Sequence, residues 1–169
     1  MNRSRIVILF IALVGALSQL PSCGIAECYE NTSSIPLAGL YSSSTLSSIS
    51  IDSITVYGIG APGDSILLDN ESSITQVYMP FRVDNGGVTQ YVFHWEQSAI
   101  SDSIYNDTLT FVYAEIPQFH SFECGAMYYY ELEEFSYTQN IIDSVAVTTD
   151  MFTNVDVETI EIYLKTSDE

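Results

Sequence analysis

Apolar and polar residues alternate over short stretches of this chain, and clusters of Ser, Asp, Asn and Gly separate the stretches. The alternation is clear near the end of the chain, where Ile160, Ile162 and Leu164 would share one face of an extended strand. No apolar period of 3.6 residues extends over a useful length. The pattern therefore predicts strands at Leu37–Tyr41, Ser53–Ile59, Ser65–Leu68, Ile74–Phe81, Thr89–Trp95, Thr108–Ala114, Met127–Phe135, Asp143–Thr148 and Val157–Lys165.

Turn signals lie between these stretches. Gly60–Asp64 and Asp84–Gly87 each have the composition of a hairpin loop. Tyr, Phe, Val, Ile and Thr are abundant, whereas the helix-favouring Lys and Arg are nearly absent. We therefore expect an all-β fold, an antiparallel β-sandwich of about eight or nine strands that forms a single domain over residues 35–169.

The first residues have the pattern of a bacterial export signal. Arg3 and Arg5 precede the uncharged apolar run Ile6–Leu17, which is too short to span a bilayer. The run leads into Leu20-Pro21-Ser22-Cys23, which resembles a lipobox, although Pro21 is unusual there. This predicts a lipoprotein signal peptide at residues 1–22, lipidation of Cys23, and a tether over residues 23–34. Cleavage nearby, with Cys23 left as a thiol, is the alternative.

The charge of the chain limits its partners. The net charge is −18, and removal of residues 1–22 leaves two basic residues against 22 acidic ones, a net charge of −20. Nucleic acids are therefore not expected as partners, because binding them requires Lys and Arg to neutralise phosphates. Charge also opposes adsorption to anionic lipids, so any membrane attachment must come from acyl chains. We expect a lipid-anchored protein of the bacterial cell envelope, at the outer membrane.

Lipidation of Cys23 would leave Cys28 and Cys124 as an even pair. In an oxidising compartment they are a disulfide candidate, and two free buried thiols are the alternative. Closing a loop of about a hundred residues is worth roughly 4 to 5 kcal/mol in the chain-entropy account. His94 and His120 are too few and too widely spaced for zinc. The acids follow no calcium-loop pattern, so neither a metal nor a cofactor is expected.

Several segments occur together in a distinctive order along the chain. They are Cys23, Cys28–Asn31, Asp52–Gly60, Asp64–Leu68, Met79–Phe81, Asp107–Tyr113 and Glu123–Gly125. The arrangement resembles a family of uncharacterised envelope lipoproteins from gut Bacteroidales, a domain of unknown function. The resemblance implies a small β-sandwich in the cell envelope and pairing of Cys28 with Cys124. It implies no known activity.

The triplet Asp-(Ser/Thr)-apolar occurs five times, against roughly one expected from composition. It resembles an O-glycosylation motif of Bacteroidetes envelope proteins, in which the hydroxyl carries the glycan. Turn residues followed by a strand would produce the same triplet in a hairpin-rich chain. The candidate O-glycosylation sites are Ser53, Ser65, Ser103, Thr108 and Ser144.

Catalytic signals are weak. There is no Gly-x-Ser-x-Gly motif. Glu131 and Glu133, near Tyr128, could suggest glycosidase chemistry, but a solvent-facing edge strand explains these acids equally well. A second set of aromatic residues could stack on a sugar, although core packing is the commoner role of such a period-two pattern. These residues are Tyr91, Phe93 and Trp95.

Two function classes remain. The first is a non-enzymatic envelope lipoprotein that serves as a binding, adhesion or structural accessory module, with an unidentified envelope protein or glycan as its partner. The second is an enzyme acting on envelope or dietary glycans. A concave pocket containing Glu131, Glu133 and Tyr128 would favour the enzyme. A sandwich without such a pocket would favour the binding module, and no catalytic residue is assigned from the sequence.

Overall fold

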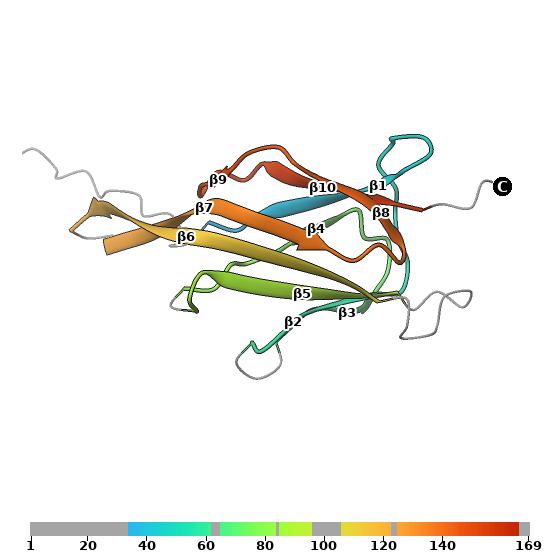
Figure 1. Cartoon of the computed structure of the whole chain (residues 1–169), viewed down its shortest axis with the longest axis horizontal. Helices are drawn as coiled ribbons and strands as arrows, with labels where there is room; N and C mark the ends of the chain where they lie inside the picture. The colour runs from blue at the N-terminus through green and yellow to red at the C-terminus, as the bar shows by residue number, and fades with distance from the viewer. Residues whose placement is uncertain (1–33, 62–64, 84, 96–105, 123–124, 166–169) are drawn as a thin grey trace, which may run out of the picture.

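The computed structural model describes residues 34–61, 65–83, 85–95, 106–122 and 125–165. Ten strands form within these residues (Figure 1). They are β1 (Leu37–Ser42), β2 (Ile54–Gly58), β3 (Ile66–Glu71), β4 (Gln76–Tyr78), β5 (Val88–Trp95), β6 (Asp107–Ser121), β7 (Gly125–Tyr137), β8 (Ile142–Val147), β9 (Met151–Phe152) and β10 (Glu158–Leu164). The described residues contain no helix of the length and apolarity needed to cross a membrane.

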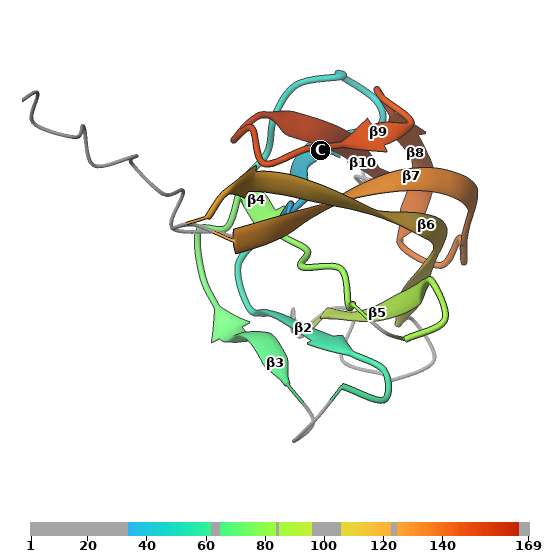
Figure 2. The ribbon, with the colours of Figure 1, turned by 90° about the vertical axis from the view of Figure 1, so that its left-hand side faces the viewer.

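The strands form two sheets. The smaller sheet has the order β4-β1-β10-β8, and the larger has the order β3-β2-β5-β6-β7-β9. Figure 2 shows the larger sheet curving from β9 through β6 toward β3, with the smaller sheet packed on its concave side. The expected all-β sandwich is therefore confirmed. The sequence pattern does not predict β9, because its two residues are too few to show an alternation.

One strand pair departs from the expected antiparallel arrangement. β1 and β10 run parallel, with Leu40 opposite Ile162 and Ser42 opposite Leu164. A parallel pair requires a long connection, and here nearly the whole domain lies between its first and last strands. The other strand pairs described are antiparallel, so β1 and β10 join the two ends of the domain in one sheet.

The core lies between the two sheets. Ile160, Ile162 and Leu164 are buried there, as the alternation predicts. Phe81 is at the centre of an aromatic cluster, with its ring stacked on Tyr113 at a centroid distance of 4.5 Å. Three further rings pack against Phe81 at centroid distances of 5.0, 5.4 and 5.2 Å, those of Phe111, Tyr130 and Phe152. Burying such side chains stabilises the sandwich by roughly 1.5 to 3 kcal/mol each.

Two predictions about the residues between β3 and β5 are wrong. The predicted strand Ile74–Phe81 is too long, because only Gln76–Tyr78 forms a strand, β4, and Pro80, which has no N–H to donate, follows soon after it. Asp84–Gly87 is not a hairpin loop, because β4 and β5 lie in different sheets. Residues 85–87 form the turn that leads into β5, where Gly86 and Gly87 have φ values of +68° and +70°.

The β6–β7 hairpin is much longer than predicted. β5 pairs with β6 only as far as Val112, whereas β7 accompanies β6 to Ser121. The distal half of the hairpin therefore projects past the rest of the larger sheet, at the left of Figure 1. Pro117 and the polar residues around it interrupt the apolar alternation there, which is why the pattern ends the first strand of the hairpin at Ala114.

Candidate functional site

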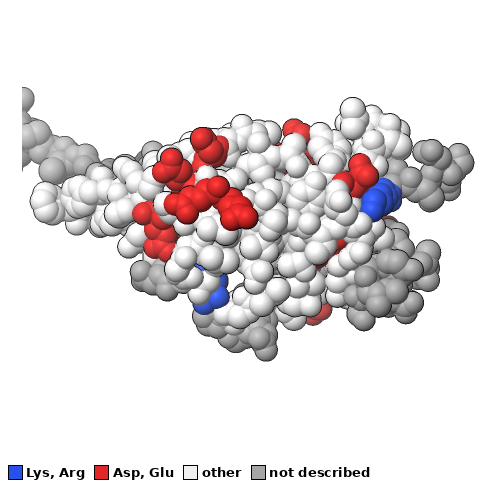
Figure 3. Space-filling view, viewed as in Figure 1, with Lys and Arg blue, Asp and Glu red and all other residues white. Residues whose placement is uncertain are grey.

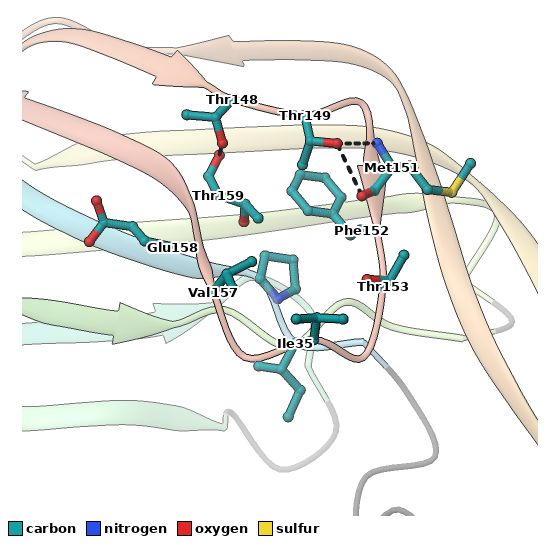
Figure 4. Close-up of a pocket in the computed structure, with 11 residues that line it drawn as sticks. Ile35, Thr148, Thr149, Met151, Phe152, Thr153, Val157, Glu158 and Thr159 are labelled. Atoms are coloured by element: carbon teal, nitrogen blue, oxygen red, sulfur yellow. Dashed lines mark hydrogen bonds between the residues drawn. The ribbon is translucent and has the colours of Figure 1, made fainter.

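A pocket of about 350 Å³ opens where the chain enters the domain, between the β8–β9 and β9–β10 connections (Figure 4). We call it the threonine pocket. Its lining residues are Ile35, Pro36, Thr148, Thr149, Met151, Phe152, Thr153, Val155, Val157, Glu158 and Thr159. The short strand β9 positions Phe152 as the buried floor, and Ile35 and Pro36 come from the far end of the sequence. The sequence signal for this site is only a concentration of threonines after residue 147.

Two of the four threonine hydroxyl groups that line the threonine pocket are hydrogen-bonded to the backbone. Thr148 Oγ1 donates to the carbonyl of Thr159 at 3.2 Å. Thr149 Oγ1 donates to the carbonyl of Met151 at 3.2 Å and accepts its N–H at 3.1 Å. The Thr159 hydroxyl is buried and has no hydrogen-bond partner among the described residues. The lining therefore offers apolar surface with a few hydroxyls, which suits non-covalent contact with a small uncharged group.

Among the described residues of this lining, Glu158 is the single titratable one, and its carboxylate points away from the other lining side chains (Figure 4). It accepts hydrogen bonds from the Tyr41 hydroxyl at 2.5 Å and from Gln76 Nε2 at 2.9 Å. This bridge ties β10 to β1 and β4. A Cβ on Gly39 would collide with the carboxylate, so glycine leaves room for the bridge. The hydrogen bond to Glu158, together with partial burial and nearby negative charge, raises the pKa of Tyr41 to about 12.

A second pocket, of about 310 Å³, lies beside the β2–β3 connection and contains one of the two basic residues of the predicted mature chain. Arg82 lines it and donates from Nη1 to the carbonyl of Gly60 at 2.7 Å. The backbone of Arg82 is fixed by the Tyr113 hydroxyl, which accepts its N–H at 3.0 Å and donates to its carbonyl at 2.7 Å. Tyr91 forms a buried wall. Nothing in the sequence pattern pointed to this pocket.

The candidate glycosidase residues are not brought together. Glu131 and Glu133 are exposed, whereas Tyr128 packs against the core. Glu133 is the extra residue of a bulge between Leu132 and Glu134. The adjacent glutamates 133 and 134 are both exposed there. Figure 3 shows acidic side chains gathered on this side of the molecule. None of these residues lines either pocket, and the described part of the chain contains no cluster of His, Cys, Asp and Glu suited to a metal.

The proposed sugar-stacking residues are part of the core. Tyr91, Phe93 and Trp95 have exposed fractions of 3%, 0% and 3%. Phe93 and Trp95 pack on each other with ring centroids 5.8 Å apart. The core interpretation of their spacing is therefore the right one.

The candidate O-glycosylation residues are dispersed over the molecule. Ser65 is exposed next to β3, whereas Ser53, Thr108 and Ser144 are partly buried. Ser53 lies just before β2, Thr108 in β6 and Ser144 in β8. Ser103 lies outside the described residues. The structure therefore brings none of them together, and their modification stays a prediction.

The cysteines, Cys23, Cys28 and Cys124, also lie outside the described residues. The first described residue, Ser34, donates from its N–H and from Oγ to the carbonyl of Tyr128, at 3.1 and 3.0 Å. The chain thus enters the domain alongside β7, next to the threonine pocket.

Comparison with known proteins gives one match. Residues 53–164, more than half of the chain, match a family of unknown function, DUF6452. The matched region begins just before β2 and ends with β10, so it includes the whole larger sheet and every strand of the smaller sheet except β1. No curated protein and no solved structure matches the chain. The chain therefore belongs to DUF6452, a family of unknown function.

Proposed function

We propose that this protein is a lipoprotein of the bacterial cell envelope, held at the outer membrane by acyl chains on Cys23. Its β-sandwich would serve there as a non-enzymatic module for binding, adhesion or structural support. The proposal combines the export and lipobox pattern of residues 1–23 with the way in which the chain enters the domain.

The position of Ser34 is the observation that carries the proposal. Its two hydrogen bonds to Tyr128 attach the start of the domain to the β6–β7 hairpin. Ser34 is eleven positions after Cys23, and a fully extended segment of that length spans at most about 40 Å. A lipid on Cys23 would therefore keep this end of the sandwich within about 40 Å of the membrane surface.

The chemistry of the pockets supports binding rather than catalysis. The threonine pocket has one titratable residue in the part of its lining that the structure describes, Glu158, whose carboxylate is hydrogen-bonded to Tyr41 and Gln76. An acid–base reaction requires a titratable group aimed at the substrate. The other acids considered, Glu131 and Glu133, are exposed outside this pocket. An uncharged part of an envelope glycan or protein fits the threonine pocket better than a reacting substrate does.

The test is fractionation of the full-length protein in a host that lipidates its own lipoproteins. The wild-type protein should sediment with membranes and enter the detergent phase. The Cys23→Ser variant should lose both properties, because it has no thiol to acylate. Cys28→Ser is the matched control, which removes a neighbouring cysteine and should remain with the membrane. A Cys23→Ser protein that stayed as membrane-bound as Cys28→Ser would overturn the proposed anchor.

A further inference from the structure

Two phenylalanines are unusually exposed at the end of the β6–β7 hairpin. Phe119 and Phe122 have exposed fractions of 66% and 96%, in contrast to the buried aromatic cluster around Phe81. Their rings contact each other edge to face, with centroids 5.4 Å apart. We call these two residues, with the exposed Pro117 and Ala126, the hairpin tip. Exposed aromatic residues grouped in this way indicate a contact surface rather than a random surface position.

The hairpin tip lies at the end of the molecule where the chain enters. Ala126 is opposite Phe119 in the hairpin, and Tyr128, which binds Ser34, is two residues further along β7. Two residues of a strand span about 7 Å. The tip and the entry point of the tether are therefore neighbours, and both are at the left end of Figure 1.

The charge distribution also distinguishes this end. Between Ile116 and Gly125 the sequence has one residue with a formal charge, Glu123, although the whole chain has 22 acidic residues. On the face shown in Figure 3, the acidic side chains gather over the body of the molecule, and the outermost part of the projecting hairpin, at the left, shows none. An aromatic, nearly uncharged surface suits the interface of a bilayer, where aromatic side chains concentrate. It also avoids the repulsion that anionic head groups would exert on acidic side chains.

We infer that Phe119 and Phe122 insert into the membrane interface beside the lipid anchor, as a second, non-covalent contact with the bilayer. The inference rests on the proposed function, because the tether from Cys23 is what brings the tip to the surface. The contact would fix the orientation of the sandwich. The connection that follows β1 is at the opposite end of the molecule (Figure 1), so Leu46, which belongs to this connection, would face away from the membrane.

The test places a tryptophan at each end of the full-length, acylated protein. Phe122→Trp reports on the tip, and Leu46→Trp is the matched control, since Leu46 is also an exposed apolar residue, with an exposed fraction of 68%. Each protein is purified from host membranes and reconstituted in phosphatidylcholine vesicles. The acyl chains of the phosphatidylcholine carry bromine at a shallow or a deep position, and the bromine quenches the fluorescence of a nearby tryptophan. The parent protein, whose single Trp95 is buried, supplies the background.

Flotation tests the lipid anchor, and quenching tests the contact of the hairpin tip with the bilayer. We expect both variants to float with the vesicles, and only Phe122→Trp to shift its emission to shorter wavelength and lose intensity, most strongly with shallow bromine. Floating protein in which Phe122→Trp is quenched no more than Leu46→Trp would overturn the tip contact and leave the anchor standing. A wavelength shift without quenching would also overturn it, because it indicates contact with protein, such as a second copy. Failure of both variants to float would overturn the anchor itself.

Discussion

At the scale of single residues, Asp107 combines burial with a complete set of hydrogen bonds. It is fully buried at the start of β6, and its carboxylate accepts four hydrogen bonds, from Thr138 Oγ1 and from the backbone N–H groups of Asn140, Ile141 and Ile142, at 2.8 to 2.9 Å. These bonds fix the connection between β7 and β8 against β6. This structural role gives one of the five Asp-(Ser/Thr)-apolar triplets an explanation that needs no glycan.

Asp107→Ala should destabilise the protein strongly. Removing the carboxylate leaves buried N–H groups without acceptors, a loss we estimate at about 3 kcal/mol of the free energy of unfolding. Asp143→Ala is the control, because Asp143 is an exposed aspartate in a triplet of the same kind and should change stability by less than about 0.5 kcal/mol. Urea denaturation measures both. Equal stability of the two variants would show that the Asp107 hydrogen bonds contribute nothing.

Tyr41 makes the free energy of unfolding depend on pH in the alkaline range. The hydrogen bond to Glu158 raises the pKa of Tyr41 from its ordinary value of 10 to about 12. Since the unfolded chain releases this proton first, the stabilisation is complete below pH 10 and is lost as the pH rises to about 12. Tyr41→Phe and Glu158→Gln should each flatten the fall in the free energy of unfolding over that range. Denaturation at a series of pH values tests this, and an unchanged fall in both variants would contradict it.

At the scale of elements, the turn into β5 depends on two glycines in different surroundings. Gly86 and Gly87 both have positive φ, which penalises any residue with a Cβ. A Cβ on Gly86 would meet nothing within 4 Å, whereas one on Gly87 would collide with the carbonyl oxygen of Tyr113. Gly87 is held there because its own carbonyl accepts the N–H of Tyr113 at 2.8 Å.

Gly87→Ala should therefore be much more harmful than Gly86→Ala. Left-handed strain alone costs roughly 1 to 2 kcal/mol, the loss expected for Gly86→Ala. Displacing the backbone of β6 should add about 1 to 3 kcal/mol in Gly87→Ala. Because the backbone strain is common to both variants, the difference between their thermal or urea midpoints measures the destabilisation that the collision causes. Two variants of equal stability would mean that β5 and β6 separate at this point without cost.

The strands were predictable from the sequence where alternation is regular. Residues 160, 162 and 164 form the buried face that their alternation predicts, and the alternating residues 109, 111 and 113 are buried in the same way. The sequence pattern does not reveal which sheet a strand belongs to, which is why it wrongly predicts a hairpin loop at Asp84–Gly87. It also could not show the threonine pocket, because Ile35 and Thr159 meet only through the parallel pairing of the first and last strands.

At the scale of the whole molecule, the chain enters its domain beside the hairpin that leads to Cys124. Cys28 precedes Ser34 by six residues and Cys124 precedes Tyr128 by four, while Ser34 and Tyr128 are hydrogen-bonded. Six extended residues reach at most about 20 Å, which is enough to bring the two thiols together. This proximity supports the proposed disulfide, which would attach the tether to the hairpin tip.

Peptide mapping of exported protein without reduction should find Cys28 joined to Cys124. Opening the bond should lower the free energy of unfolding by up to about 4 kcal/mol, since it closes a long loop. The double variant Cys28→Ala, Cys124→Ala should have the stability of the reduced wild-type protein. Quantitative alkylation of both thiols in freshly exported, unreduced protein would rule the disulfide out.

The most direct test of the whole account is the mass of the mature N-terminus. Protein extracted from the membranes of a lipidating host should begin at Cys23, and its first peptide should be heavier by a diacylglycerol and, where the host adds it, an amide-linked acyl chain. Residues 1–22 should be absent. An unmodified N-terminus at another position, with an alkylatable thiol on Cys23, would contradict the anchor and with it the orientation inferred for the hairpin tip.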